Sequence, residues 1–126
     1  MIVSHCQAEL PREACGLLAG VKSSKEFHIK SVQHLRNVAA SGFLYEVNAE
    51  DLYKAFKKAE EEGLEVLGFY HSHPLGGVQP SEVDREKAAY PGLVYLILSP
   101  TRDDWKVGAY LWTGGWFKEV SVIVEE

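Results

Sequence analysis

Residues 66–84 read VLGFYHSHPLGGVQPSEVD, an apolar run followed by two histidines, a glycine loop and a helix start. The dense apolar run at 66–70 predicts a buried strand. Alternate side chains of a strand point to the same face, so His71 and His73 present two imidazoles to one point. Pro74 ends the strand, which places both histidines at the rim of a sheet.

A helix is predicted after the glycine loop. Pro80 and Ser81 mark its start, and we expect it to continue to about Tyr90. Asp84 lies three residues after Ser81, so its carboxylate can come back towards the two histidines. Two imidazoles and one carboxylate leave a fourth tetrahedral position for water, as in catalytic zinc sites. Zinc lowers the pKa of such a water, and the site then needs a base to take the proton.

Other interpretations of these residues stay open. Two histidines at a strand end are common at a solvated surface or in a satisfied core. Ser81 and Asp84 also match a variant of the helix capping box, and the Gly-Gly loop also fits an ordinary turn. The capping and catalytic interpretations are compatible, because a capped helix would aim both side chains.

The rest of the chain alternates strands and helices. Before residue 66 we expect a short helix within residues 1–10 that ends before Pro11, strands at 16–21, 27–36 and 43–47, and a helix capped by Asn48 and ended by Gly63. After the second helix we expect strands at 93–99, 106–112 and 116–124, the last two joined by a hairpin turn at 113–115. This order predicts the α/β (α+β) class with a mixed sheet.

Length and composition limit the classes of protein. The 126 residues predict one domain over 1–126, and 46% apolar with 25% charged residues excludes disorder. A net charge of −5 disfavours nucleic acid as a partner. No apolar run reaches the about 18 residues of a spanning helix and no export leader is visible, so we expect a cytoplasmic protein with no membrane partner. Cys6 and Cys15 are more typical of small buried hydrophobes than of a disulfide.

The motif resembles the signature of the JAMM (MPN-plus) metalloprotease family: an upstream glutamate, H-x-H-P, seven residues, then S-x-x-D. Here the two parts lie at 71–74 and 81–84, and the upstream match is Glu13 in EACGLL at 13–18. The likeness covers nearly the whole chain, including the YLILS strand at 95–99. It implies a minimal, stand-alone member of prokaryotic or archaeal type. The implied fold is a curved mixed β-sheet flanked by two to three helices, related in shape to the cytidine deaminase fold.

The resemblance also implies a chemistry for each residue. His71, His73 and Asp84 would bind one catalytic Zn²⁺. Glu13 would deprotonate the bound water and pass the proton to the leaving amine, and Ser81 would donate a hydrogen bond to the oxyanion. The implied reaction is hydrolysis of the amide bond after the C-terminal glycine of a ubiquitin-like small modifier protein, in lysine conjugates or in precursor tails. The alternatives are a sulfur-carrier tail peptidase that releases an amino acid and a non-catalytic metal-binding adaptor.

The substrate side depends on fewer observations. Leu75, Gly76 and Gly77 lie beside the expected metal, so we predict that they line a groove for the modifier's glycine-ended tail; a solvated loop is the alternative. The zincin motif H-E-x-x-H and the deaminase pair H-x-E and P-C-x-x-C are both absent from the sequence. We expect the three tryptophans to lie in the core or in a self-association face that would allow a homodimer, rather than to contact substrate: Trp105, Trp112 and Trp116.

Overall fold

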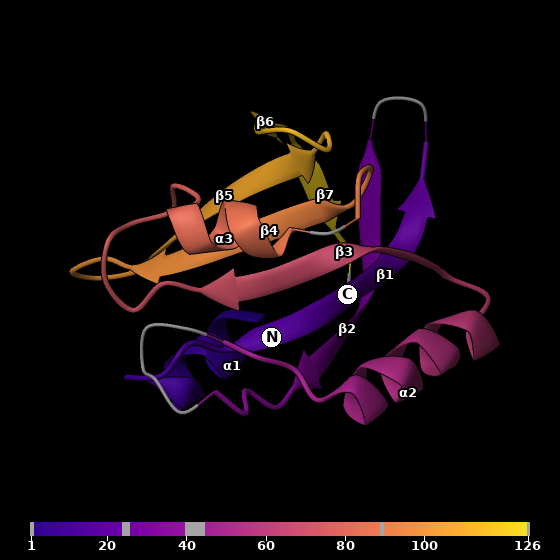
Figure 1. Cartoon of the computed structure of the whole chain (residues 1–126), viewed down its shortest axis with the longest axis horizontal. Coiled ribbons are helices and arrows are strands. Elements are labelled where there is room, and N and C mark those ends of the chain that lie inside the picture. Colours follow the sequence, from indigo (N-terminus) through magenta and orange to yellow (C-terminus); the bar gives the residue numbers. More distant parts are fainter. Residues whose placement is uncertain (1, 24–25, 40–44, 89, 126) are drawn as a thin grey trace.

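A curled sheet with helices against it makes up the described part of the chain, residues 2–23, 26–39, 45–88 and 90–125 of a computed structural model (Figure 1). The helices are α1 (Ile2–Glu9), α2 (Ala49–Glu61) and α3 (Glu82–Lys87). The strands are β1 (Cys15–Lys22), β2 (Phe27–Leu35), β3 (Glu65–Ser72), β4 (Val94–Pro100), β5 (Trp105–Trp112), β6 (Phe117–Glu119) and β7 (Val122–Val124).

The sheet is mixed, in the order β6-β5-β4-β3-β1-β2-β7. The pairs β3–β4 and β2–β7 are parallel, and the other neighbours are antiparallel. A curved mixed sheet flanked by helices confirms the predicted α/β (α+β) class. No helix of the described residues is long and apolar enough to cross a bilayer.

Both faces of the central strands are covered, so β1 is buried along most of its length. Leu17 and Ala19 pack in one apolar cluster with Ala55 and Ala59 of α2. Leu18 belongs to the cluster on the opposite face, to which α1 contributes two residues, Ile2 and Cys6. Figure 1 shows α2 beside β1 and β2, and α3 next to β4. The ends of β1 and β3 are therefore held rigidly between two layers of side chains.

The C-terminal segment differs from the prediction of one strand over 116–124. It forms two short strands, of which β6 pairs with β5 and β7 pairs with β2 at the opposite edge of the sheet. Val120 and Val122 pack against the apolar cluster that also contains Leu18 and Leu96. Burying these two valines draws the chain across the open side of the curled sheet, so a single straight strand cannot form.

Two further predictions were wrong in detail. The strand expected at 43–47 lies partly outside the described residues, and residues 45–47 form no strand. Instead, the Val38 N–H donates to the Glu46 carbonyl, and further hydrogen bonds join this segment to Asn37 and Lys87. The helix expected to reach Tyr90 ends at Lys87, because Ala88 adopts an extended conformation with ψ 112°.

Several local predictions are confirmed. The Asn48 side chain accepts the N–H groups of Glu50 and Asp51 at the start of α2, and Gly63 follows the helix with φ +71°. Cys6 and Cys15 are free, buried thiols. Of the tryptophans, Trp105 and Trp112 pack in or against the core, whereas Trp116 is 65% exposed.

Candidate metal centre

The two histidines lie at the end of β3, in the middle of the sheet. His71 pairs with Cys15 of β1 on one side and with Ile97 of β4 on the other. The His73 N–H donates to the Leu98 carbonyl at 2.7 Å, which extends the pairing beyond the last residue of β3. Both side chains are buried, as the alternation of the strand requires for two residues on one face.

Helix α3 brings Asp84 to these histidines. The Ser81 hydroxyl accepts the Asp84 N–H at 3.0 Å, and Asp84 Oδ2 accepts the Ser81 N–H at 2.8 Å. This reciprocal pair is a capping box, so the capping interpretation is confirmed. The same hydrogen bonds hold the carboxylate turned back over the helix start, where it meets the two imidazoles.

The three side chains converge on one point. Asp84 Oδ1 lies 3.0 Å from His71 Nε2, and Asp84 Oδ2 lies 2.9 Å from His73 Nε2. The two Nε2 atoms are 3.2 Å apart. All three ligand atoms lie within 4.8 Å of one another, which makes this the one group of three or more His, Cys, Asp or Glu side chains among the described residues that could hold a metal ion.

The donor set itself fits a cation. His73 Nδ1 lies 3.0 Å from the Gly77 carbonyl, which can only accept a hydrogen bond, so Nδ1 carries the hydrogen. In the neutral ring the Nε2 lone pair then faces the Asp84 carboxylate, and a positive charge between them is needed. Burial acts to raise the pKa of Asp84, but its hydrogen bonds with both histidines outweigh this effect and hold the pKa well below its usual range. Two nitrogens and a carboxylate oxygen are ligands that suit zinc.

Burial acts differently on the two imidazoles. It lowers the pKa of His71, which is fully enclosed, despite the neighbouring Asp84. Burial also acts to lower the pKa of His73, but the hydrogen bond and charge of Asp84, together with Gly77 and Glu13, outweigh it and raise the pKa. A histidine must be neutral to bind a metal. Burial already favours the neutral form of His71, whereas His73 would have to release a proton when the metal binds.

Glu13 is placed beside the histidines by the pairing of β1 with β3. Ala14 and Ser72 are joined by two hydrogen bonds, from the Ala14 N–H to Ser72 Oγ at 2.8 Å and from the Ser72 N–H to the Ala14 carbonyl at 3.0 Å. Glu13 is only 7% exposed. Burial, with the Asp84 charge adding and His73 opposing, raises the pKa of Glu13 to about 7. A carboxyl with such a pKa can both accept and donate a proton near neutrality.

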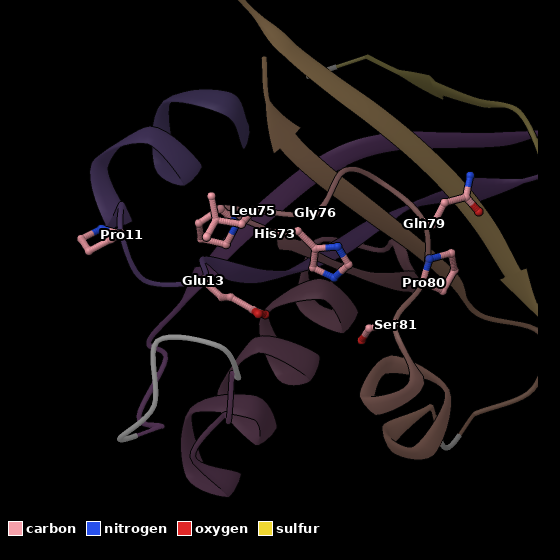
Figure 2. A pocket seen from close by; sticks show the side chains of 9 residues that line it. Pro11, Glu13, His73, Leu75, Gly76, Gln79, Pro80 and Ser81 are labelled. Atoms are coloured by element: carbon pink, nitrogen blue, oxygen red, sulfur yellow. The ribbon is translucent and has the colours of Figure 1, made fainter. Parts of the chain in front are cut away.

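A pocket of about 410 Å³ opens beside this group and is lined by Pro11, Glu13, His73, Pro74, Leu75, Gly76, Gln79, Pro80 and Ser81. In Figure 2 the side chains of Glu13, His73 and Ser81 point into the same space from just before β1, just after β3 and just before α3. Leu75 and Gly76, two of the three predicted substrate residues, line the pocket, and Leu75 is 81% exposed. The third, Gly77, is not among the lining residues, and its carbonyl accepts the hydrogen bond from His73.

Asn37 supports Glu13 and was not expected from the sequence. Its Nδ2 donates to the Glu13 carbonyl at 2.8 Å, and its Oδ1 accepts the N–H groups of Ala39 and Glu46. Asn37 is 7% exposed, so these bonds join the loop after β2 to the start of β1 inside the protein. A single buried asparagine has no periodicity or spacing that could have revealed it.

The fold and this group define the class: a JAB/MPN-type domain with a candidate metal centre. The chain belongs to the prokaryotic homologues of the JAB domain, a family that matches residues 1–109. It is 40% identical to the desampylase of Haloferax volcanii over 98% of this chain and 89% of that protein. It is 32% identical to the CysO-cysteine peptidase of Mycobacterium tuberculosis over 81% of this chain and 68% of that protein. These relatives make the chain a hydrolase of the JAMM protease type.

A solved structure shows the same fold. The solution structure of a protein from Desulfitobacterium hafniense superposes with a TM-score of 0.87 at 29% sequence identity. The match covers 99% of this chain and 86% of that chain. The family predicted from the residues at 13, 71, 73, 81 and 84 is therefore confirmed by comparison of the whole chain.

Proposed function

We propose that this protein is a zinc-dependent isopeptidase that hydrolyses the amide bond after the C-terminal glycine of ubiquitin-like small modifier proteins. The observation that carries the proposal is the convergence of His71, His73 and Asp84 beside a buried Glu13 in one open pocket. The likeness to the Haloferax desampylase supports the substrate class. The cytoplasmic location and the homodimer expected from the sequence stay predictions.

The proposed ligands are His71, His73 and Asp84. The chemistry that Zn²⁺ supplies when bound there is Lewis-acid polarisation of water and of a carbonyl. The Glu13 carboxylate takes a proton from the attacking water and later gives it to the leaving nitrogen, and a pKa of about 7 suits both steps. The Ser81 hydroxyl accepts one hydrogen bond, from the Asp84 N–H, so its own hydrogen is left to donate to the developing oxyanion.

The pocket wall supports an extended, glycine-ended substrate. Leu75, Pro11 and Pro80 supply apolar surface around Glu13 and His73, and Gly76 adds no side chain to the opening. We assign Leu75 and Gly76 to binding of the modifier tail. Gly77 instead fixes the loop, because its carbonyl accepts the hydrogen bond from His73 Nδ1. A tail of small residues could approach the metal ligands here without a steric clash.

Hydrolysis of a linear tail is the second candidate. The likeness to the CysO-cysteine peptidase supports it, because that protein's name gives an amino acid as the leaving group. The residues proposed for the chemical step would be the same. The two candidates differ only in the amine that leaves, which is a lysine side chain in one and a free amino acid in the other.

Cleavage of lysine-linked conjugates of a ubiquitin-like modifier tests the proposal. The wild type should cleave them, and the activity should disappear after chelation and return when zinc is added back. Glu13→Gln should bind zinc and keep the fold but lose cleavage by at least about a hundredfold. Glu60→Gln, an exposed change on α2, is the matched control and should cleave normally.

Three outcomes would contradict the proposal. If the zinc-loaded wild type cleaves neither conjugates nor linear Gly-Gly tails, the non-catalytic adaptor becomes the favoured interpretation. Glu13→Gln with undiminished activity would remove the base from the mechanism. Cleavage of linear tails alone would replace the isopeptidase by the second candidate.

A further inference from the structure

The two histidines of the metal centre differ in what orients their rings. A metal-binding histidine usually donates its second ring N–H to a carbonyl or carboxylate, which fixes the ring. His73 has this partner, because its Nδ1 donates to the Gly77 carbonyl at 3.0 Å. His71 Nδ1 is buried and has no hydrogen-bond partner among the described residues. Apart from the contact of its Nε2 with Asp84, the His71 ring therefore depends on packing for its orientation.

Tyr45 supplies that packing. Its ring stacks on the His71 ring, with 4.8 Å between the ring centroids and an angle of 25° between the planes. Tyr45 comes from the segment just before α2 and packs against the same apolar cluster as Cys15, the β1 neighbour of His71. The tyrosine ring thus covers one face of an imidazole whose Nδ1 has no hydrogen-bond partner among the described residues.

Lys87 holds Tyr45 in place. Its ammonium donates to the Tyr45 carbonyl at 2.7 Å and lies 5.6 Å from the centroid of the Tyr45 ring, within range of a cation–π interaction. Lys87 is in the last turn of α3, three residues after Asp84. Helix α3 has six residues and none of them is buried, so it has few other contacts to fix its position. The contact with Tyr45 ties its C-terminal end to the rest of the protein.

We propose that Tyr45 and Lys87 are positioning residues that hold two metal ligands together, Tyr45 by fixing the His71 ring and Lys87 by fixing α3, which carries Asp84. The inference rests on the metal site of the proposed function. Neither residue offers a metal ligand or lines the pocket that contains Glu13 and Ser81. Their loss should weaken metal binding even though every ligand remains.

The test measures the zinc dissociation constant by competition with a chromophoric chelator. Lys87→Met keeps the length of the side chain but removes the ammonium, and it should weaken zinc binding about tenfold, the lower end of the effect of removing a group that supports a ligand. Lys87→Arg restores the charge and the donor, so it should recover most of the affinity. Lys54→Met is the matched control. Lys54 is an exposed lysine on α2, far from the metal ligands in sequence, and this variant should bind zinc like the wild type.

The tyrosine is tested in the same way. Tyr45→Leu removes the stacked ring and should also weaken zinc binding about tenfold, whereas Tyr45→Phe keeps the ring and should retain most of the affinity. The visible spectrum of the cobalt-substituted protein reports ligand geometry directly and should shift in Tyr45→Leu and Lys87→Met. Should Tyr45→Leu fail to fold, the zinc affinities of Lys87→Met and Lys87→Arg still test whether the contact with Tyr45 supports the metal site.

Zinc affinity within twofold of the wild type in Lys87→Met and Tyr45→Leu would overturn the inference. Equal losses in Lys87→Met and Lys87→Arg would also overturn the part assigned to the ammonium. These results would leave the proposed hydrolysis untouched. Conversely, a wild type that binds zinc but hydrolyses nothing would contradict the proposed function and not the role of Tyr45 and Lys87.

Discussion

Replacing Glu13 by glutamine should stabilise the metal-free protein at alkaline pH, although it removes the proposed base. Burial raises the pKa of this side chain from an ordinary 4.5 to about 7. Each pKa unit corresponds to about 1.4 kcal/mol, so the ionised carboxylate costs the fold about 3 kcal/mol above pH 7. That is a large part of the stability of an ordinary domain, which is about 5–15 kcal/mol.

The sign follows from proton binding. The pKa of Glu13 is higher in the folded state than in the unfolded state, so the folded protein binds more protons between about pH 4.5 and 7. The free energy of unfolding therefore falls as the pH rises through this window and stays lowered above it. Glutamine does not ionise, so the gain in stability over the wild type should be close to zero near pH 4 and about 3 kcal/mol near pH 8.

Urea unfolding of chelator-treated protein at the two pH values measures this gain. With a urea dependence of about 1–3 kcal/mol per molar, the midpoint of Glu13→Gln should lie about 1–3 M above that of the wild type near pH 8. Glu60→Gln, on the exposed side of α2, should show no pH-dependent gain. A Glu13→Gln protein that is no more stable than the wild type near pH 8 would refute the reasoning.

Three other predictions concern the loop, the sheet and the thiols. Leu75→Ala removes exposed apolar surface at the pocket and should raise KM roughly tenfold without changing zinc affinity, as steady-state kinetics would show. In Gly68→Ala the new Cβ would lie 1.7 Å from the Val94 carbonyl, so the β3–β4 pairing must yield; calorimetry should show a loss of about 3 kcal/mol or more. Burial raises the pKa of Cys6 to about 11 and of Cys15 to about 12, so a thiol reagent near pH 8 should label the native protein far more slowly than the unfolded one.

Each of these has a matched comparison. Tyr53→Ala changes another exposed apolar side chain, on α2, and should leave KM unchanged. Gly115→Ala meets no atom within 4 Å of the new Cβ and should be tolerated. Equal effects in the Leu75 and Tyr53 variants, or in the two glycine variants, would contradict the first two predictions. Native thiols that react as fast as unfolded ones would contradict the third.

The sequence predicts the local part of the site well. His71 and His73 are two residues apart on a strand, and Ser81 and Asp84 are joined by a helix cap, so period and capping rules suffice to bring them together. Glu13 is different, because it reaches the histidines only through the pairing of β1 with β3. Residue spacing carries no information about which strands pair, so only the family resemblance identified it.

The same limit explains the misread C-terminus. Alternation along 116–124 predicts extended chain but not its partner, and here the two halves pair with β5 and β2. Tyr45 and Lys87 escaped notice for a related reason. Each is an ordinary residue in its own segment, and their relation to His71 and Asp84 exists only after the chain has folded.

The position of residues 117–124 also has a consequence for how the sheet is completed during folding. One segment supplies both edge strands, and each edge strand is only three residues long. Until this segment docks, β5 and β2 present long unpaired edges that another chain could join. The parallel contact between β2 and β7 pairs Phe27 with Val122, about three quarters of the chain length apart, and such distant pairings are slow to form. We therefore expect the docking of this segment to be a late step in folding, and the step that covers the edges of β5 and β2.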